Sequence, residues 1–399
     1  MNNSSTILAQ ILNFIPEYEL RKLVLKYGTD RYSKTFRTKD LLTSLIFAQS
    51  IEAESLREIT DSFSALKNYY YHLGLPASGV KRSTLADCNS RVDYRVFQEL
   101  FYVMVDKYQS TIFGNRSLGI DEDVYALDAS FIEVVMSLVD WNRFRADKGA
   151  IKLHTVYSVT KQIPVLINIT PGKIHDLSGM PALDKRFTNS IITFDKGYWR
   201  AYWFKQLDER KINFVTRIKK NVNYEVTGQH KLTTEDMRQG VLKDEEIVFT
   251  STELKEDYPQ TLRLVTYYDE ENDKQYRFIT NLTDSKKHSA KKIADIYRYR
   301  WQIELFFKWI KQNLKVKTFY GTTKNAVFNQ IWVALIYYLI VSHIQSQASY
   351  PYSKLELTRV INLSLLQRIP LINLMRADFE SAKKYFRVSE DQLNLFDSS

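Results

Sequence analysis

Cysteine, glycine and proline are all scarce in this chain of 399 residues. The single cysteine, Cys88, excludes an intramolecular disulfide framework and a thiolate-rich zinc site, and it suits a reducing compartment. With 12 glycines and 8 prolines, the composition is neither collagen-like nor that of a Pro/Gly-rich disordered chain. The first residues carry no basic stretch ahead of a long apolar run, so we expect no signal peptide.

An uncharged segment lies towards the C-terminal end. Residues 326–353 contain no Asp, Glu, Lys or Arg, and residues 331–341 are continuously apolar. This apolar stretch is shorter than the roughly 18–20 residues that a membrane-spanning helix needs. A helix that is apolar on all sides is usually buried in a large domain. The sequence therefore predicts a core helix and no membrane partner.

The overall charge is positive. The chain carries 56 basic and 46 acidic residues, for a formal net charge of +10. Because 44% of the residues are hydrophobic and 26% are charged, the composition is that of an ordinary globular protein. The positive excess favours a polyanionic partner, although many basic proteins bind no nucleic acid.

The spacing of apolar residues changes along the chain. In the N-terminal part of the chain, apolar residues recur with helical spacing, as at Leu8, Ile11, Leu12 and Ile15. The same spacing returns after residue 285. Between these regions, β-branched runs alternate with helical spacing and then give way to polar, alternating runs. We expect an α/β core interrupted by a β-rich insertion, with an all-helical N-terminal domain and a helical C-terminal tail. The expected segments are 1–118 (N-terminal domain), 119–212 (core, first part), 213–284 (insertion), 285–345 (core, second part) and 346–399 (tail).

Most of the net charge lies in one stretch, residues 286–324. It contains eleven basic residues and two acidic ones, with aromatic residues interleaved. At about 100° per residue, Tyr297, Arg300, Lys308 and Lys311 would lie on the same side of a helix as Glu304. Such a strip suits a metal-binding carboxylate within a phosphate-binding surface, because basic side chains neutralise phosphates. The alternative is a solvated helix stabilised by Glu–Lys pairs.

A hard cation such as Mg²⁺ needs more than one carboxylate. Asp128 lies within a predicted strand, where an unpaired charge is costly, and Asp195 ends the apolar run 191–194. Taken singly, each is more often a capping or turn residue. The competing acids nearby are Asp121, Asp123, Glu133, Asp140 and Asp176.

Three patterns together resemble a known family. The basic stretch contains the signature Tyr297-x2-Arg300-x3-Glu304-x6-Lys311. It matches the signature of the DDE transposases of bacterial insertion sequences, in the insertion-sequence-four family. Asp128 in Tyr-Ala-Leu-Asp-Ala-Ser and Asp195 in Phe-Asp-Lys-Gly-Tyr-Trp resemble the first and second aspartate motifs of that family. The segment between Asp195 and Glu304 resembles its β-strand insertion, so the resemblance covers most of the chain.

The resemblance implies an RNase H-like core in which Asp128, Asp195 and Glu304 bind two Mg²⁺ ions, with Mn²⁺ able to substitute. The implied activity is cut-and-paste transposition by phosphoryl transfer at the ends of the element. It places Tyr297, Arg300 and Lys311 on the DNA backbone, and Lys308 lies on the same helical face. If excision passes through a hairpin with a flipped base, Trp301 is a stacking residue. Trp199 is a second candidate, but a core position is the better interpretation for it.

The helical N-terminal domain resembles the part of this family that binds the terminal inverted repeats. Lys81 and Arg82 are its candidate DNA contacts, and Cys88 is expected to pack inside it. The expected partners are double-stranded DNA, both inverted repeats and target, and a second copy of the chain in a synaptic homodimer. The expected location is the bacterial cytoplasm, at the nucleoid. No metal-ligand spacing includes His154 or His175, so both are expected to be structural.

Two alternatives remain open at the level of sequence. The chain could be a catalytically silent DNA-binding derivative of a transposase, although all three acids are present. It could also be a Mg²⁺-dependent nuclease on the same core that cuts DNA without joining it.

Overall fold

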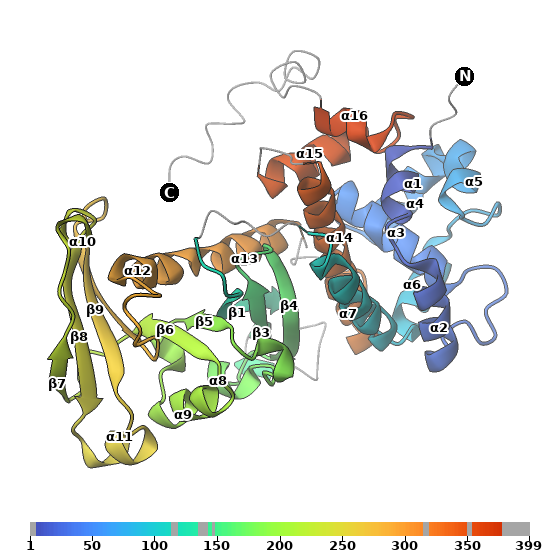
Figure 1. Cartoon of the computed structure of the whole chain (residues 1–399). Coiled ribbons are helices and arrows are strands. Elements are labelled where there is room, and N and C mark those ends of the chain that lie inside the picture. The colour runs from blue at the N-terminus through green and yellow to red at the C-terminus, as the bar shows by residue number, and fades with distance from the viewer. Residues whose placement is uncertain are drawn as a thin grey trace. The chain divides into compact units, whose positions relative to one another are not determined.

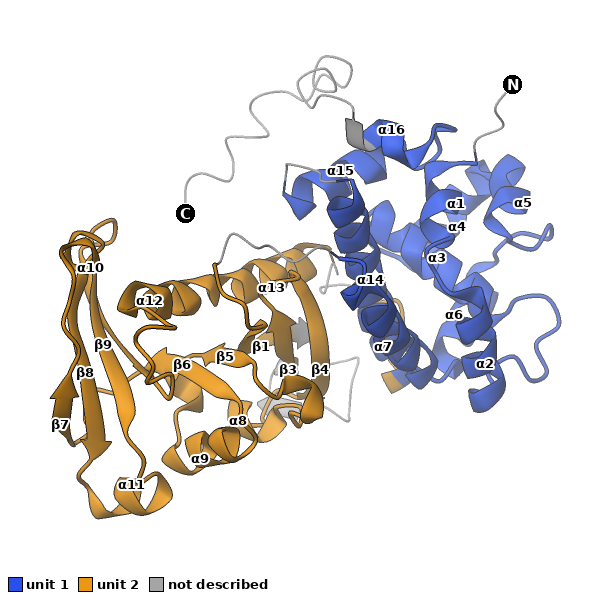
Figure 2. Ribbon diagram, viewed as in Figure 1, with its two compact units in different colours: residues 1–112, 325–399 blue, residues 113–324 orange. Residues whose placement is uncertain are grey.

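The computed structural model describes residues 5–112, 119–134, 143–145, 148–313, 319–348 and 353–376. The chain folds into two compact units, coloured separately in Figure 2. Unit 1 combines residues 1–112 with residues 325–399, and unit 2 comprises residues 113–324. Asp140, Lys315, Lys317 and the end of the tail, residues 377–399, lie outside the described residues.

Unit 1 is helical, as expected for the N-terminal domain. Its helices form where apolar residues recur every three or four positions, so that Leu8 and Ile11 are fully buried. Local signals set several ends: the Ser55 hydroxyl accepts from the Glu58 amide, and Gly28 ends a helix at φ 61°. The helices are α1 (Ile7–Leu12), α2 (Glu17–Tyr27), α3 (Thr38–Ser50), α4 (Leu56–Ala65), α5 (Tyr70–Leu73), α6 (Arg82–Arg91), α7 (Arg95–Gln109), α14 (Lys324–Gln347), α15 (Lys354–Ser364) and α16 (Leu371–Arg376), with a 3₁₀ turn at Lys67–Tyr69.

The long apolar helix α14 is the core of unit 1. It is long and apolar enough to cross a membrane, yet 94% of its most apolar window is buried within the protein. The predicted core helix is therefore confirmed.

The predicted segment 285–345 placed α14 with the catalytic core, whereas its contacts are with the N-terminal helices. The Asn329 amide donates to the carbonyls of Asn89 (3.0 Å) and Val92 (3.1 Å), and the Trp332 ring lies 5.4 Å from that of Phe101. By these contacts α14 is grouped with the N-terminal helices in unit 1.

Unit 2 is built on one sheet of ten strands. Nine of them follow the order β2-β3-β1-β5-β6-β10-β9-β8-β7, and β4 pairs with β3. The strands are β1 (Val124–Val134), β2 (Arg143–Arg145), β3 (Lys148–Ser158), β4 (Ile163–Pro171), β5 (Ile191–Phe194), β6 (Asn213–Arg217), β7 (Tyr224–Gln229), β8 (Val241–Phe249), β9 (Leu262–Asp269) and β10 (Lys274–Thr280). The sheet with its helices gives unit 2 an α/β fold.

Strand direction separates the core from the insertion. β1, β5 and β6 are parallel, and β3 and β4 continue the sheet in antiparallel pairs on one side. On the other side β10, β9, β8 and β7 add only antiparallel pairs. The predicted insertion, 213–284, begins one strand too early, because β6 pairs in parallel with the buried strand β5 and belongs to the core.

Helices cover both faces of the core strands (Figure 1). The helices α12 (Ala290–Tyr299) and α13 (Trp301–Asn313) lie on one face, and α8 (Asp176–Gly179) and α9 (Ala201–Glu209) on the other. Two further helices, α10 (Thr234–Arg238) and α11 (Thr252–Asp257), belong to the insertion, and 3₁₀ turns occur at Lys185–Phe187 and Lys196–Tyr198. The chain thus returns to the core strands through α12 and α13, which fall within the segment predicted as the second part of the core, 285–345.

Candidate active site

The parallel pairing of β1 and β5 brings two of the predicted acids together. Leu127 is paired with Phe194 at the end of the ladder, and Asp128 and Asp195 are the next residue on each strand. β5 stops there, because Asp195 starts a 3₁₀ turn, while β1 continues against β3. Both aspartates therefore occupy the edge where parallel strands end, which is the usual place for sites in open α/β sheets.

The third acid, Glu304, comes from the first turn of α13, and Arg300 joins it to Asp128. Nη1 of Arg300 lies 3.1 Å from Oδ2 of Asp128, and Nη2 lies 2.6 Å from Oε1 of Glu304. Arg300 occupies the junction at which α12 ends and α13 begins, and its side chain is only 14% exposed. The spacing Arg300-x3-Glu304 thus produces an ion pair between neighbouring turns. The same guanidinium also pairs with Asp128, on a strand far away in sequence.

Asp195 has two partners of its own. The Tyr297 hydroxyl donates to its Oδ1 at 3.2 Å, and Nη2 of Arg217 lies 2.6 Å from the same oxygen. The Arg217 guanidinium also lies 5.5 Å from the centre of the Tyr297 ring. The sequence predicted Tyr297 but missed Arg217, which is the last residue of β6. Only the parallel pairing of β6 with β5 reveals it. Phe194 is paired with Thr216, so the next residues on the two strands, Asp195 and Arg217, lie side by side.

The environment gives the two aspartates opposite pKa shifts. Burial raises the pKa of Asp128 to about 6, and the charges of Glu304 and Asp195 add to this. The Ala129 amide and Arg300 offset only part of the shift. For Asp195, burial alone would raise the pKa, but the hydrogen bond and charge of Arg217, the Lys196 amide and the charge of Arg300 together outweigh burial, so the pKa is lowered.

Three carboxylates are the hard oxygen donors that divalent cations such as Mg²⁺ prefer. Among the described residues, no three acidic, histidine or cysteine side chains already surround one point, because arginines lie between the acids. Several buried polar atoms around the acids have no hydrogen-bond partner: Oγ1 of Thr155 and Thr193, the hydroxyl of Tyr198, and Nε of Arg217 and Arg300. Thr155 stands opposite Asp128 in the sheet. This polar, unsatisfied lining fits a cation with its water and a phosphate.

The other predicted DNA contacts of this region belong to α13 and are exposed. Trp301 is 59% exposed, and Lys308 and Lys311 are exposed on α13. Trp199 is buried, so the core interpretation is the correct one for this residue. In unit 1, Lys81 and Arg82 are exposed at the start of α6, and Cys88 is buried as predicted.

The competing residues do not join the three acids. Asp121 and Asp123 are exposed, and Asp176 forms an ion pair with Lys152 at 2.8 Å. Asp140 and the side chain of Glu133 lie outside the described residues. His154 is buried with Nε2 2.8 Å from Oγ1 of Thr170, and Nδ1 of His175 accepts from the Leu177 amide, so both histidines have structural partners.

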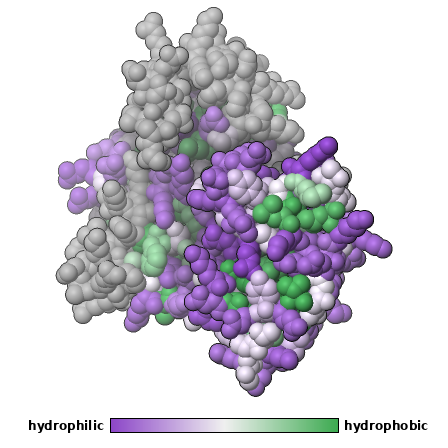
Figure 3. Space-filling view, turned by 90° about the vertical axis from the view of Figure 1, so that its left-hand side faces the viewer, coloured by the Kyte–Doolittle hydropathy of each residue, from purple (hydrophilic) through white to green (hydrophobic). Residues whose placement is uncertain are grey.

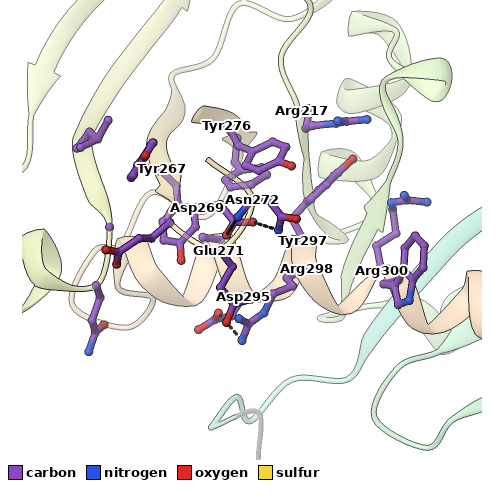
Figure 4. Close-up of a pocket in the computed structure, with 18 of the residues that line it drawn as sticks. Arg217, Tyr267, Asp269, Glu271, Asn272, Tyr276, Asp295, Tyr297, Arg298 and Arg300 are labelled. Atoms are coloured by element: carbon purple, nitrogen blue, oxygen red, sulfur yellow. Dashed lines mark hydrogen bonds and ion pairs between the residues drawn. The ribbon is translucent and has the colours of Figure 1, made fainter. Parts of the chain in front are cut away.

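A groove of about 870 Å³ opens beside the acids, between α12 and the strands of the insertion (Figure 4). Arg217, Tyr297, Arg300 and Trp301 line the end nearest the acids. Tyr267, Tyr276 and Phe278 continue it along β9 and β10, and Asp269, Glu271 and Asp295 line its far part. The groove therefore combines cationic, aromatic and acidic walls.

The outer surface of the insertion is mainly polar. Figure 3 looks at the side on which the insertion lies in Figure 1, and it shows small separate apolar patches within a largely hydrophilic surface. Val226, Met237 and Leu242 are exposed apolar residues of this region.

Comparison with known proteins identifies the family. The family model described as a transposase DDE domain matches residues 119–340, which include all three acids. The chain belongs to the DDE transposase family of bacterial insertion sequences. A second model, a domain of unknown function (DUF4372), matches residues 3–76. The resemblance drawn from the sequence signature is thus confirmed.

Curated relatives agree with this assignment. A Geobacillus stearothermophilus protein assigned as the transposase of insertion sequence element IS5377 is 25% identical over 87% of this chain and 87% of its own. A Sinorhizobium fredii protein assigned as transposase y4zB is 31% identical over 64% of this chain and 69% of its own. A Synechocystis protein assigned as the transposase of element IS4SA is 23% identical over 80% of this chain and 88% of its own.

Among solved structures, the piggyBac transposase synaptic complex with hairpin DNA matches 95% of this chain and 81% of that chain. The identity is 15% and the TM-score 0.40, which is too loose a superposition to support a conclusion. DDE transposases generally use divalent metal ions, and membership of the family implies phosphoryl transfer on DNA for this chain.

Proposed function

We propose that this transposase excises and inserts its element by cut-and-paste transposition, with Asp128, Asp195 and Glu304 as the ligands of two Mg²⁺ ions. The observation that carries the proposal is the convergence of these acids from β1, the end of β5 and α13 around Arg300 and Arg217. The strand order β4-β3-β1-β5-β6, with only β3 antiparallel to both of its neighbours, supports an RNase H-like core.

The surrounding side chains prepare the site for phosphates. Bound Mg²⁺ would supply activation of a water or 3′-hydroxyl nucleophile and stabilisation of the leaving oxygen, and Mn²⁺ is expected to substitute. Arg300 and Tyr297 donate directly to the acids, so they would orient the scissile phosphate. Lys308 and Lys311, exposed on α13, would neutralise the neighbouring backbone.

Trp301 would stack on a base that leaves the duplex if excision proceeds through hairpin ends. Its ring is exposed beside Arg300 and borders the groove, so a flipped base has an aromatic surface within reach of the acids. Stacking on such a surface offsets part of the cost of unstacking the base.

The helical residues of unit 1 would bind the terminal inverted repeats, with Lys81 and Arg82 at the exposed start of α6. Two ends must meet for transposition, so we expect a homodimer in the synaptic complex, acting on DNA at the nucleoid in the bacterial cytoplasm. Light scattering that finds only monomers on paired ends would contradict the dimer.

A cleavage and strand-transfer assay tests the proposal. Wild type and Glu304→Ala are compared in Mg²⁺ on DNA that carries the element ends, with exposed Glu253→Ala on α11 as the matched control. Glu304→Ala should lose cutting and joining but retain end binding, because its side chain holds metal rather than DNA. Glu253→Ala should cut and join like wild type.

The same assay separates the two alternatives. Cutting without joining would indicate a Mg²⁺-dependent nuclease, and end binding without any reaction by wild type would indicate a silent DNA-binding derivative. The presence of all three acids around Arg300 and Arg217 favours the transposase over the silent derivative.

A further inference from the structure

Arg217 belongs to the site although it is not part of the sequence signature. Its Nη2 lies 2.6 Å from Oδ1 of Asp195, and both side chains are about one-third exposed. Its Nε is buried and has no hydrogen-bond partner. The guanidinium therefore uses only part of its donor capacity on Asp195, although Arg can bind two oxygens side by side.

The position of Arg217 is set by the sheet and not by a flexible loop. It is the last residue of β6, between Asp195 at the end of β5 and Phe278 on β10. The Tyr297 ring lies against the guanidinium at 5.5 Å from its centre. Arg217 also lines the groove that leads away from the acids. Its side chain therefore borders both the Asp195 carboxylate and the groove.

The charges of the neighbouring groups decide whether Arg217 pairs with Asp195 or with a ligand in the groove. Burial and the charge of Arg300 lower the pKa of Arg217, but the hydrogen bond and charge of Asp195 together with the charge of Tyr297 outweigh them, so the pKa is raised. A divalent cation on Asp195 would remove the anion that holds Arg217 and add a second repulsive charge. A phosphate is the anion that would then accept a bidentate hydrogen bond from the guanidinium.

We propose that Arg217 is a positioning residue that exchanges Asp195 for a DNA phosphate, so that metal binding and DNA binding favour each other. The inference rests on the proposed function, in which Asp195 is a metal ligand. Without metal or DNA, Arg217 neutralises Asp195 and keeps the carboxylate ordered. When DNA arrives, a phosphate takes Arg217 and leaves the carboxylate open for the cation. Such a coupling is reciprocal by thermodynamic necessity.

A double-mutant cycle on DNA affinity tests the exchange without metal or chemistry. Wild type, Asp195→Asn, Arg217→Gln and the double variant are titrated in EDTA with a duplex carrying the element's terminal inverted repeat. Asp195→Asn should bind the duplex about fivefold more tightly than wild type, because an ion pair of ~1 kcal/mol no longer holds Arg217. The gain should disappear in the Arg217→Gln background. A gain of equal size in both backgrounds would show only a long-range charge effect and would overturn the proposal, as would no gain at all.

Metal affinity provides the second measurement and separates the two proposals. Without DNA, Arg217→Gln should bind Mn²⁺ about fivefold more tightly than wild type by electron paramagnetic resonance, for the same reason. Arg186→Gln is the matched control, since it removes an arginine that pairs with Asp184 at 2.9 Å. Unchanged or weaker Mn²⁺ binding by Arg217→Gln would overturn the exchange. If Asp195→Asn binds Mn²⁺ as wild type does, the metal assignment in the proposed function fails instead.

Discussion

Nη1 of Arg300 lies 3.1 Å from Oδ2 of Asp128, a residue 172 positions earlier in the chain. The pair joins the middle of a central strand to the junction of two helices that follow the insertion. Asp128 would otherwise be a buried carboxylate without a cationic partner, which is a costly arrangement in a protein interior. Arg300 therefore stabilises the buried carboxylate before any ligand binds. Its guanidinium is then a hydrogen-bond donor for a phosphate that enters the site.

The pKa of Asp128 predicts how metal binding depends on pH. Burial raises this pKa to about 6, so the carboxyl is protonated below that pH and cannot hold a cation. Mn²⁺ affinity should fall as the pH drops through about 6, with the uptake of one proton. Arg300→Gln should move the fall to higher pH, because Arg300 lowers the pKa of Asp128. Titrating Mn²⁺ at several pH values checks this, and a midpoint near the ordinary value of a free aspartate would contradict it.

Loss of the exposed indole of Trp301 should weaken stacking on an unpaired base. Trp301→Ala is expected to reduce the rate of end processing by the equivalent of about 1–3 kcal/mol per stacked base, and Trp301→Phe by less. A 2-aminopurine at the terminal position of the element reports the unstacking directly through its fluorescence. The control is Tyr202→Ala, since Tyr202 is 45% exposed on α9, across the sheet from α13. Equal effects of the two alanine variants would argue against a stacking role.

The buried pair Arg263–Asp244 should be a main stabilising contact of the insertion. Both guanidinium–carboxylate contacts are 2.7 Å, and Arg263 also donates to the carbonyls of Leu282 and His288. Arg263→Met leaves Asp244 buried without its partner, which should cost about 3–5 kcal/mol of unfolding free energy in urea. Adding Asp244→Leu should restore much of that loss.

A surface pair of unit 2 serves as the control for that experiment. Arg186→Met removes an exposed arginine 2.9 Å from the exposed Asp184, and it should change the unfolding free energy by less than about 0.5 kcal/mol. A loss at Arg263 as small as the loss at Arg186 would show that the buried pair contributes little.

The chain reversal at Gly240, before β8, has no room for a side chain. Gly240 has φ +89°, and a Cβ there would lie 2.4 Å from the carbonyl oxygen of Tyr268. Gly240→Ala should therefore lower the unfolding free energy by about 1–3 kcal/mol, the cost of forced backbone strain. Gly197→Ala is the control, because a Cβ at Gly197 meets nothing within 4 Å. Equal stabilities in thermal unfolding would contradict the strain at Gly240.

Much of this protein follows from the sequence because the signals are local. The period of apolar residues predicted the helices of unit 1 and the buried character of α14, since an element that is apolar on all sides must be enclosed. The same holds for Tyr297, Arg300 and Glu304, because residues three or four apart lie on one side of a helical segment. Spacing indicated which side of this helical segment carries these residues, whereas Asp128 and Asp195 were singled out among several nearby acids by the resemblance to the transposase family.

Tertiary structure decided what depends on pairing between distant segments. Arg217 reaches Asp195 only because β6 pairs in parallel with β5, and no local pattern marks that choice. Asn329 joins α14 to unit 1 through carbonyls more than 200 residues away, a grouping that the local sequence pattern did not indicate. The raised pKa of Asp128 likewise comes from burial beneath helices that follow the insertion. Residue types and apolar periods depend only on residues close together in the chain. These contacts depend instead on which distant strands and helices pack against one another.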